Sequence, residues 1–560
     1  MICKFLNNGT NFKSAREDIN SKLLTLTVVV IGVVVLASTL YGVYHFYSPI
    51  IFGDEWDGYI GFYSNSDKFA SWWAQHNEHR ILTSRLLFWL DLSYFHGNHI
   101  ILFAAQLAMT ASVIVIILVA YKRNNNNAPS AWVIGLACAF LFSWSQHEAL
   151  TWGFETQVAA VSFFAVWSIA EFFQFDNPVI RRFVAGFGLA ALSEFSMGNG
   201  LGAPLTLVAI NLLGRRPRLE SIAASIIALA LFGIYFINYS WIIVQCPPAS
   251  GYKPLLFAEF FLIFLGNALF FSGGTLTQLG VVGALTFLSG AGIIIYLYIT
   301  RQMTQYRIFL IGVYLFVIAT ALAATGGRFK CGLDWAHSSR NTGGPLLGWL
   351  VLSLLWADVF SHVTWRRTVM VASVALAAFL LPSQTPVGDD NAYLYDRKLG
   401  LLSYNIGLEH TEYTKLLFPL PLHSRFVQRV RYASEHKLGV YSQQWLIDAG
   451  TLKYNPNLRR DASCRGYLDT VTEDNIGMRL AGWATGGSDR DGTIIVITDS
   501  AGNTVGYGVT GQARPDVVKA VPGAPADSGW VGFAKRVEGR PTAYAFIEGA
   551  FCKIESSLGN

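Results

Sequence analysis

Long apolar segments recur through the first two-thirds of this sequence and constrain its fold more than any other feature. About 20 helical residues cross the ~30 Å hydrocarbon core of a bilayer. Only 14% of the residues are charged and 52% are hydrophobic, whereas about a quarter of a soluble protein is charged. We therefore predict an α-helical polytopic membrane domain of about eleven spans or re-entrant helices, near residues 23–46, 98–121, 129–146, 157–174, 183–213, 219–240, 254–272, 279–299, 308–324, 344–360 and 367–382.

The distribution of Lys and Arg predicts the orientation of these spans, because cytoplasmic loops are enriched in basic residues. Residues 1–22 contain four basic residues and are predicted to form a cytoplasmic tail. The first span is too long for a cleavable signal peptide. Further cytoplasmic turns are marked by Lys122 with Arg123, Arg181 with Arg182, Arg215 with Arg216 and Arg218, Arg301 with Arg307, and Arg366 with Arg367. This arrangement requires residues 183–213 to be a re-entrant pair that turns at residues 196–200, and residues 254–278 to enter and leave on the outer side.

With this orientation, almost all acidic and His residues of the membrane domain fall on the outer side. Ionisable groups at a membrane boundary are costly to desolvate, so such an accumulation indicates a functional site. The outer loop 47–97 also contains aromatic and aliphatic residues at spacings of three and four, including Phe69, Trp72 and Trp73. That spacing predicts amphipathic helices that lie along the membrane interface.

An acidic pair, Asp54-Glu55, directly follows the first span and precedes these interface helices. This arrangement resembles the type C glycosyltransferase superfamily over roughly residues 20–380. The segments QHNEHR (75–80) and SSRN (338–341) are similar to those of bacterial members that glycosylate cell-surface polysaccharide or lipid. The resemblance implies a polyprenyl-phosphate-linked sugar donor, a glycan or lipid acceptor, and an active site on the extracytoplasmic face of a bacterial inner membrane. It also implies that Asp54 and Glu55 supply the catalytic base.

The chemistry of such a transfer suggests roles for further residues. A carboxylate deprotonates the acceptor hydroxyl, and cationic groups offset the charge of the leaving phosphate. We expect Arg328, Lys330 and Arg340 to bind the donor phosphate. An inverting transfer needs no second carboxylate as nucleophile. Candidate substrate-binding residues are His76, Glu78, His79, Arg80, Glu155, Gln157, Asn199, Asp334 and His337.

Several alternatives remain open from the residues alone. Asp54 and Glu55 could begin an ordinary solvated loop, and the three basic residues could bind lipid headgroups. His76 and His79 could bind a divalent metal or make structural hydrogen bonds, so the metal and cofactor requirement stays undecided. The alternative functions are an O-antigen-type polymerase or ligase and a non-enzymatic flippase of lipid-linked sugars. A transporter places charged residues deep within its spans, and Glu194 alone fits that description.

The C-terminal third loses the apolar periodicity. Residues 383–461 are predicted to form a mixed, partly helical extracytoplasmic region with a helix at 421–437. Residues 462–560 contain short strand-like runs at 493–498, 505–509, 530–534 and 542–547, separated by turn residues, which predicts a small antiparallel β-sandwich. On the outer side an oxidising compartment permits disulfides, and we expect the pairs Cys464–Cys552 and Cys246–Cys331. The basic residues form short clusters rather than one face, so no nucleic-acid partner is expected.

Overall fold

The computed structural model describes residues 2–125, 130–241, 254–360, 363–389, 392–418, 423–460, 465–485 and 492–556. The chain divides into two compact units. The helical unit comprises Met1–Tyr47, Trp72–Leu87 and Ile101–Asp389. The mixed unit comprises Ser48–Ser71, Phe88–Ile100 and Asp390–Asn560. The loop that follows the first predicted span therefore contributes to both units.

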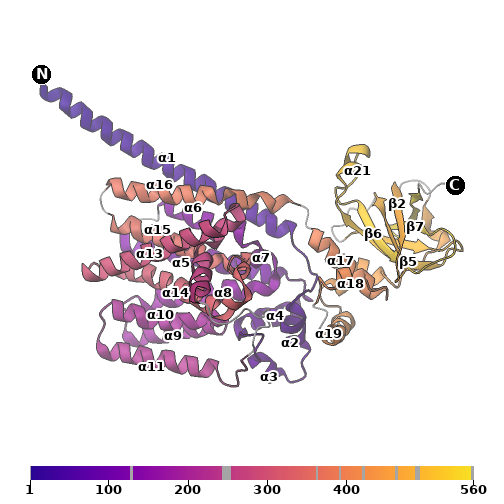
Figure 1. Cartoon of the computed structure of the whole chain (residues 1–560), viewed down its shortest axis with the longest axis horizontal. Coiled ribbons are helices and arrows are strands. Elements are labelled where there is room, and N and C mark those ends of the chain that lie inside the picture. Colours follow the sequence, from indigo (N-terminus) through magenta and orange to yellow (C-terminus); the bar gives the residue numbers. More distant parts are fainter. Residues whose placement is uncertain are drawn as a thin grey trace. The chain divides into compact units, whose positions relative to one another are not determined.

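Long helices make up most of the helical unit (Figure 1). They are α1 (Ile2–His45), α5 (Ile100–Asn125), α6 (Ala131–Leu141), α8 (Thr156–Phe172), α9 (Val179–Glu194), α10 (Gly202–Leu213), α11 (Arg218–Tyr235), α12 (Pro254–Gly266), α13 (Leu276–Ile299), α14 (Gln305–Arg328), α15 (Gly343–Val359) and α16 (Val363–Phe379). Short helical turns join several of them, among them η2 (Trp144–Gln146), α7 (His147–Thr151), η3 (Gly153–Glu155), η4 (Gly198–Leu201), η5 (Asn267–Ser272), η6 (Phe329–Cys331), η7 (Leu333–Trp335), η8 (Ser339–Asn341) and η9 (Leu381–Gly388).

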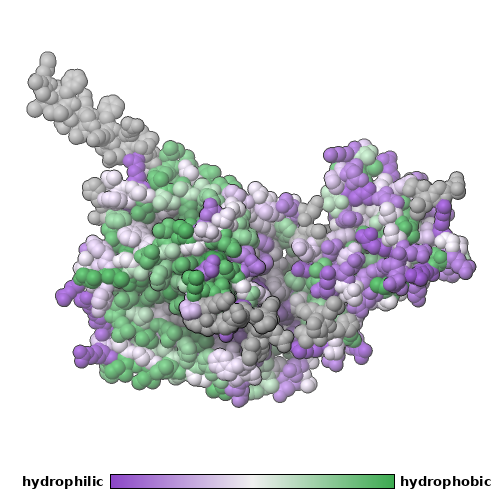
Figure 2. Space-filling model, in the orientation of Figure 1, coloured by the Kyte–Doolittle hydropathy of each residue, from purple (hydrophilic) through white to green (hydrophobic). Residues whose placement is uncertain are grey.

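Within the described residues, nine helical segments are long and apolar enough to cross a membrane. They are Ser21–His45, Ile100–Asn124, Gly153–Phe172, Arg218–Tyr235, Pro254–Ser272, Leu276–Ile299, Gln305–Cys331, Ser339–Val359 and Thr364–Asn405, the last of which includes residues 390 and 391 outside the described part. Their outward faces are apolar too: in α11, Leu219 is 78% and Leu229 is 71% exposed. Figure 2 shows this hydrophobic surface over the helical unit. Helices that are hydrophobic all round lie in a protein core or span a membrane, and the long apolar helices with exposed apolar faces are compatible with the multi-pass membrane class predicted from the sequence.

Two predicted spans differ from simple crossings. The segment 129–146 contains only the eleven-residue helix α6, and the chain then turns through η2. The segment 183–213 is broken at η4 into α9 and α10, as its polar residues 196–200 predicted. Both differences arise where small or polar residues interrupt an apolar run, because such residues favour turns over continued helix.

Glycines allow the closest helix contacts of this unit. A Cβ built on Gly283 of α13 would overlap the carbonyl of Leu262 in α12, and one on Gly266 would overlap the carbonyl of Leu279. The pair Gly32 and Gly135 joins α1 and α6 in the same way. Small residues at helix interfaces are the usual means of close packing in membranes, where apolar burial alone does not drive association.

The mixed unit combines short helices with a β-sheet. Its helices include η1 (Trp56–Ile60), α2 (Gly61–Ser64), α17 (Ala392–Asn405), α18 (Thr411–Thr414), α19 (His423–Glu435), η11 (Gly439–Ser442), α20 (Gln444–Asp448), η12 (Pro456–Leu458) and α21 (Pro515–Ala520). The helices α3 (Lys68–Trp73) and α4 (Leu82–Tyr94) cross the division between the units. The predicted helix at 421–437 is α19, whose Phe426 and Val430 are buried.

Within the described residues, nine strands belong to one sheet, so the two packed sheets of the predicted sandwich are not confirmed. The strands are β1 (Arg459–Arg460), β2 (Gly466–Glu473), β3 (Met478–Ala484), β4 (Ile494–Thr498), β5 (Thr504–Gln512), β6 (Gly529–Ala534), β7 (Thr542–Ile547), β8 (Ala550–Lys553) and β9 (Glu555–Ser556). Their order is β1-β8-β7-β4-β5-β6-β3-β2-β9. The four strand-like runs read from the sequence correspond to β4 to β7.

The ends of this sheet are joined by residues 550–556. In the first half of this segment, β8 pairs antiparallel with β7 and parallel with β1. Two residues later, β9 pairs parallel with β2 at the other end of the strand order. The sheet is therefore curled back on itself around a core that includes Leu480, Ile495 and Trp530.

The structure describes only one cysteine of each predicted disulfide. Cys246 and Cys464 lie outside the described residues, so the pairs Cys246–Cys331 and Cys464–Cys552 stay predictions. Cys138 in α6 carries a free thiol.

Candidate functional site

Two of the three predicted phosphate ligands lie on one aromatic ring of the helical unit. Arg328 is the last residue of α14, Trp335 ends η7, and Arg340 lies in η8. The guanidinium carbons of Arg328 and Arg340 lie 5.0 Å and 5.7 Å from the centroid of the Trp335 ring. Trp335 is 37% exposed. We refer to these three residues as the arginine–tryptophan cluster.

Each arginine of this cluster has a carboxylate partner. Arg328 forms an ion pair with Glu78, and an Arg340 nitrogen lies 3.7 Å from a Glu155 oxygen. Glu155 is almost fully buried, whereas the side chains of Arg328 and Arg340 remain 25% and 33% exposed. A guanidinium has five N–H donors, and in each arginine one carboxylate helps to orient this group.

Glu78 is positioned by a tight turn. His76 and His79 exchange two backbone hydrogen bonds of 2.8 Å, and Asn77 between them has a positive φ of 47°. His79 Nε2 lies 3.7 Å from Glu78, and its Nδ1 accepts the Gly198 N–H at 3.3 Å. The QHNEHR segment thus places Glu78 and His79 together between Arg328 and the η4 turn.

Other predicted ligands make separate contacts. Asn199 in η4 donates to the Thr320 hydroxyl at 3.3 Å. His337 stacks on Phe270 with ring centroids 4.0 Å apart and lies 3.4 Å from the exposed carboxylate of Asp334. Three predicted residues make their contacts elsewhere: His76 packs against Phe154, Gln157 is buried in α8, and the exposed Lys330 lies over Phe329.

The Arg80 side chain is held by backbone carbonyls and has a structural role. It is 2% exposed and donates hydrogen bonds to the carbonyls of Trp73, Tyr235 and Ile237. Its guanidinium also lies 4.4 Å from the centroid of the Trp73 ring. With its donors satisfied by backbone carbonyls, Arg80 fixes the end of α11 against the turn that carries Glu78.

Metal binding was left undecided by the sequence. Over the described ranges, no group of three or more His, Cys, Asp or Glu side chains is placed to hold a metal ion. His76 and His79 are joined through their backbones, the His76 ring packs against Phe154, and the His79 ring accepts the Gly198 N–H. The arrangement fits the structural interpretation of this histidine pair.

The acidic pair lies in the mixed unit and its two members differ sharply. Glu55 is 1% exposed and accepts the Phe52 N–H at 3.0 Å. Asp54 is half-buried, and no hydrogen bond or ion pair of its side chain is found among the described residues. A base must offer an oxygen to its substrate, so Asp54 is the better placed of the two.

A buried polar group next to Glu55 was not foreseen. His99 Nε2 lies 3.9 Å from Glu55, and Asp91 accepts hydrogen bonds from the Tyr59 hydroxyl at 2.6 Å and the His99 N–H at 3.1 Å. Burial raises the pKa of Asp91 to about 6 and lowers the pKa of His99 to about 4. The signal was a lone acid inside the apolar run of residues 86–92.

Comparison of the chain with protein-family profiles, with curated proteins and with solved structures gives no match.

Proposed function

We propose that this protein is a membrane glycosyltransferase that transfers a sugar from a polyprenyl-phosphate donor to a glycan or lipid acceptor on the extracytoplasmic face of a bacterial inner membrane. The arginine–tryptophan cluster is the observation that supports the proposal most directly. Two half-buried guanidinium groups on one ring, each oriented by a carboxylate, are suited to a phosphate, which Arg binds with paired hydrogen bonds.

The cluster also fits the charge change of the reaction. The bond from the anomeric carbon to the phosphate oxygen breaks, and negative charge grows on the leaving lipid phosphate. Preorganised cations lower the barrier most when they lie where charge develops. Glu78 and Glu155 keep Arg328 and Arg340 in place before the donor binds, so little reorganisation is needed. The exposed face of Trp335 offers an apolar surface for a sugar ring or an isoprenoid unit.

Asp54 is assigned as the base that removes the acceptor proton. Its carboxylate is accessible and has no competing partner among the described residues. Glu55 is instead held beside His99 within a buried polar group, which suits a positioning role. A flippase remains the second candidate, because the carboxylate of Glu194 is fully buried without a hydrogen-bond partner in the described structure.

The phosphate role is tested by Arg328→Ala and Arg340→Ala. Each variant should raise the donor KM or lower kcat by about tenfold to a hundredfold, because an anion loses a charge-assisted contact. Lys at either position should restore only part of the activity, since it lacks the paired donors. Arg181→Ala, an exposed arginine of α9, is the matched control. Kinetics equal to that control for both variants would reduce the cluster to a headgroup anchor.

The base is tested separately by Asp54→Asn in the same transfer assay. Removal of a general base costs about 10²–10⁴-fold in rate, while donor binding should be unchanged. Activity within a factor of about three of wild type would remove Asp54 from the mechanism. Donor flipping without any sugar transfer, in sealed vesicles, would favour the flippase instead.

A further inference from the structure

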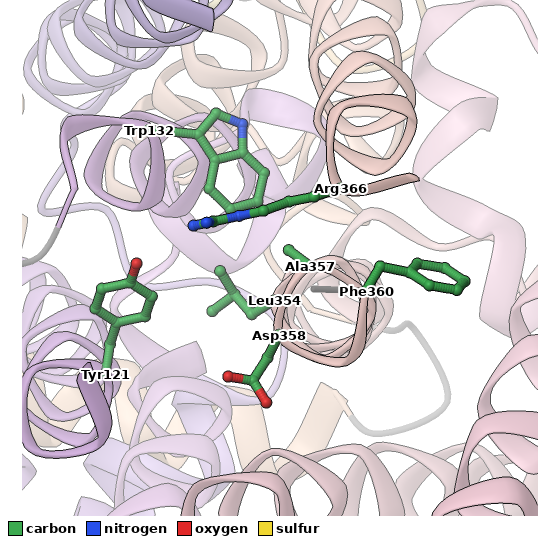
Figure 3. Close-up of a pocket in the computed structure, with 7 residues that line it drawn as sticks. All are labelled: Tyr121, Trp132, Leu354, Ala357, Asp358, Phe360 and Arg366. Atoms are coloured by element: carbon green, nitrogen blue, oxygen red, sulfur yellow. The ribbon is translucent and has the colours of Figure 1, made fainter. Parts of the chain in front are cut away.

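A polar cavity lies at the other end of α14 and α15 from the arginine–tryptophan cluster. It encloses about 510 Å³ of free space, part of it open to the surroundings. Its lining combines the aromatic rings of Tyr121, Trp132 and Phe360 with Asp358 and Arg366 (Figure 3). These residues come from α5, α6, the end of α15 and the first turns of α16.

Asp358, an acid in this lining, is already neutralised. Arg307 Nε lies 2.7 Å from Asp358 Oδ2, and the Asn124 side chain donates to Asp358 Oδ1 at 3.2 Å. Both carboxylate oxygens are therefore engaged. An ammonium ligand would have to displace one of these partners, so the cavity does not favour a cation.

Arg366, in contrast, has an uncommitted charge. It is exposed, and within the described ranges neither a hydrogen bond nor an ion pair holds its guanidinium. In Figure 3 the side chain of Arg366 extends across the cavity, and its guanidinium lies on the same side as Tyr121. A charged donor thus lies beside apolar rings.

The surroundings add positive charge at the same level. Lys122 and Arg123 follow Tyr121 in the last turn of α5 and are exposed. Basic pockets between helix ends bind the phosphates of anionic lipids, and aromatic rings are frequent at this depth of the bilayer.

We propose that this cavity binds the phosphate of an anionic phospholipid headgroup, with Arg366 as the charged ligand. The acyl chains would then follow the apolar surfaces of the adjacent helices. This site is separate from the arginine–tryptophan cluster, and it holds whether or not the protein transfers sugars.

The test is native mass spectrometry of the detergent-purified full chain titrated with phosphatidylglycerol or phosphatidylethanolamine. Wild type should retain phosphatidylglycerol more tightly. Arg366→Ala should weaken that binding about tenfold or more, as expected for loss of a hydrogen-bonded charge pair. The matched variant Arg123→Ala removes an exposed arginine outside the cavity and should cost at most about fivefold. Both positions are exposed, so neither variant should disturb folding.

Three results would overturn the assignment. Equal affinity of wild type for the two lipids would show that the cavity does not select an anion. Equal losses in Arg366→Ala and Arg123→Ala would reduce the effect to general surface charge. Displacement of the bound lipid by millimolar inorganic phosphate would make the natural ligand a soluble phosphate.

Discussion

Asp91 and His99 are buried together in the mixed unit, and their titrations oppose one another. The pKa of Asp91 is raised above its ordinary value of 3.8 to about 6, so the stability it contributes is present at low pH and is lost as the pH rises from about 4 to 6. The pKa of His99 is lowered from 6.5 to about 4, so its contribution is lost as the pH falls through that window. The two opposing pH dependences of stability largely cancel in the wild type.

Substitution of Asp91 or His99 should reveal the pH dependence of stability that the remaining residue causes. Asp91→Asn keeps an acceptor for Tyr59 but removes the titration, so stability should fall by roughly 3 kcal/mol between pH 6.5 and 4. His99→Gln should show the opposite trend over the same range. The measurement is the thermal unfolding midpoint of the purified protein as a function of pH. A wild-type slope in both variants would mean that neither group titrates as described.

At the scale of single residues, the sequence revealed charge but not burial. Arg328 and Arg340 could be assigned to one site because they are twelve positions apart at the ends of neighbouring apolar runs. Their shared contact with Trp335 could not be foreseen, because it depends on the paths of η6, η7 and η8. Asp91 was overlooked for a related reason: only the fold shows that its helix face points toward Tyr59 and His99 rather than toward water.

The helix pair α12 and α13 depends on two glycines for its close approach. Gly283→Ala would place a methyl group against the Leu262 carbonyl of α12, and such overpacking costs about 1–3 kcal/mol. Gly280→Ala lies on the same helix with nothing within 4 Å of the added carbon, and it should be neutral or slightly stabilising. Thermal unfolding in one detergent compares the two variants. Equal unfolding midpoints would show that α12 and α13 can move apart without loss of stability.

At the scale of elements, prediction succeeded wherever the pattern was local. The apolar runs and the strands β4 to β7 are each defined by consecutive residues, and both were found. The pairing order was not found, because β1 and β9 are two-residue strands without a sequence signature and their partners lie far along the chain. A sandwich and a single curled sheet share the same alternation of strands and turns, so the sequence could not separate them.

For the molecule as a whole, the basic turns predict which side each part occupies. Ser500 lies in the exposed turn between β4 and β5, and Arg123 lies in the last turn of α5. Ser500→Cys should react with a membrane-impermeant maleimide in intact spheroplasts, whereas Arg123→Cys should react only after lysis. Wild type gives the background of the native cysteines. The reverse pattern would invert the orientation and place the arginine–tryptophan cluster on the cytoplasmic side.

The segment 550–556 is the last in chain order to enter the sheet, although it bridges both of its ends. Until this segment has been synthesised, β2 and β7 each retain a row of unpaired backbone groups, and such edges attract other chains. Completion of the sheet is therefore delayed until translation of this region has finished. A ribosome stalled before residue 550 would leave an open, adhesive intermediate, and the timing of synthesis becomes part of how this region avoids aggregation.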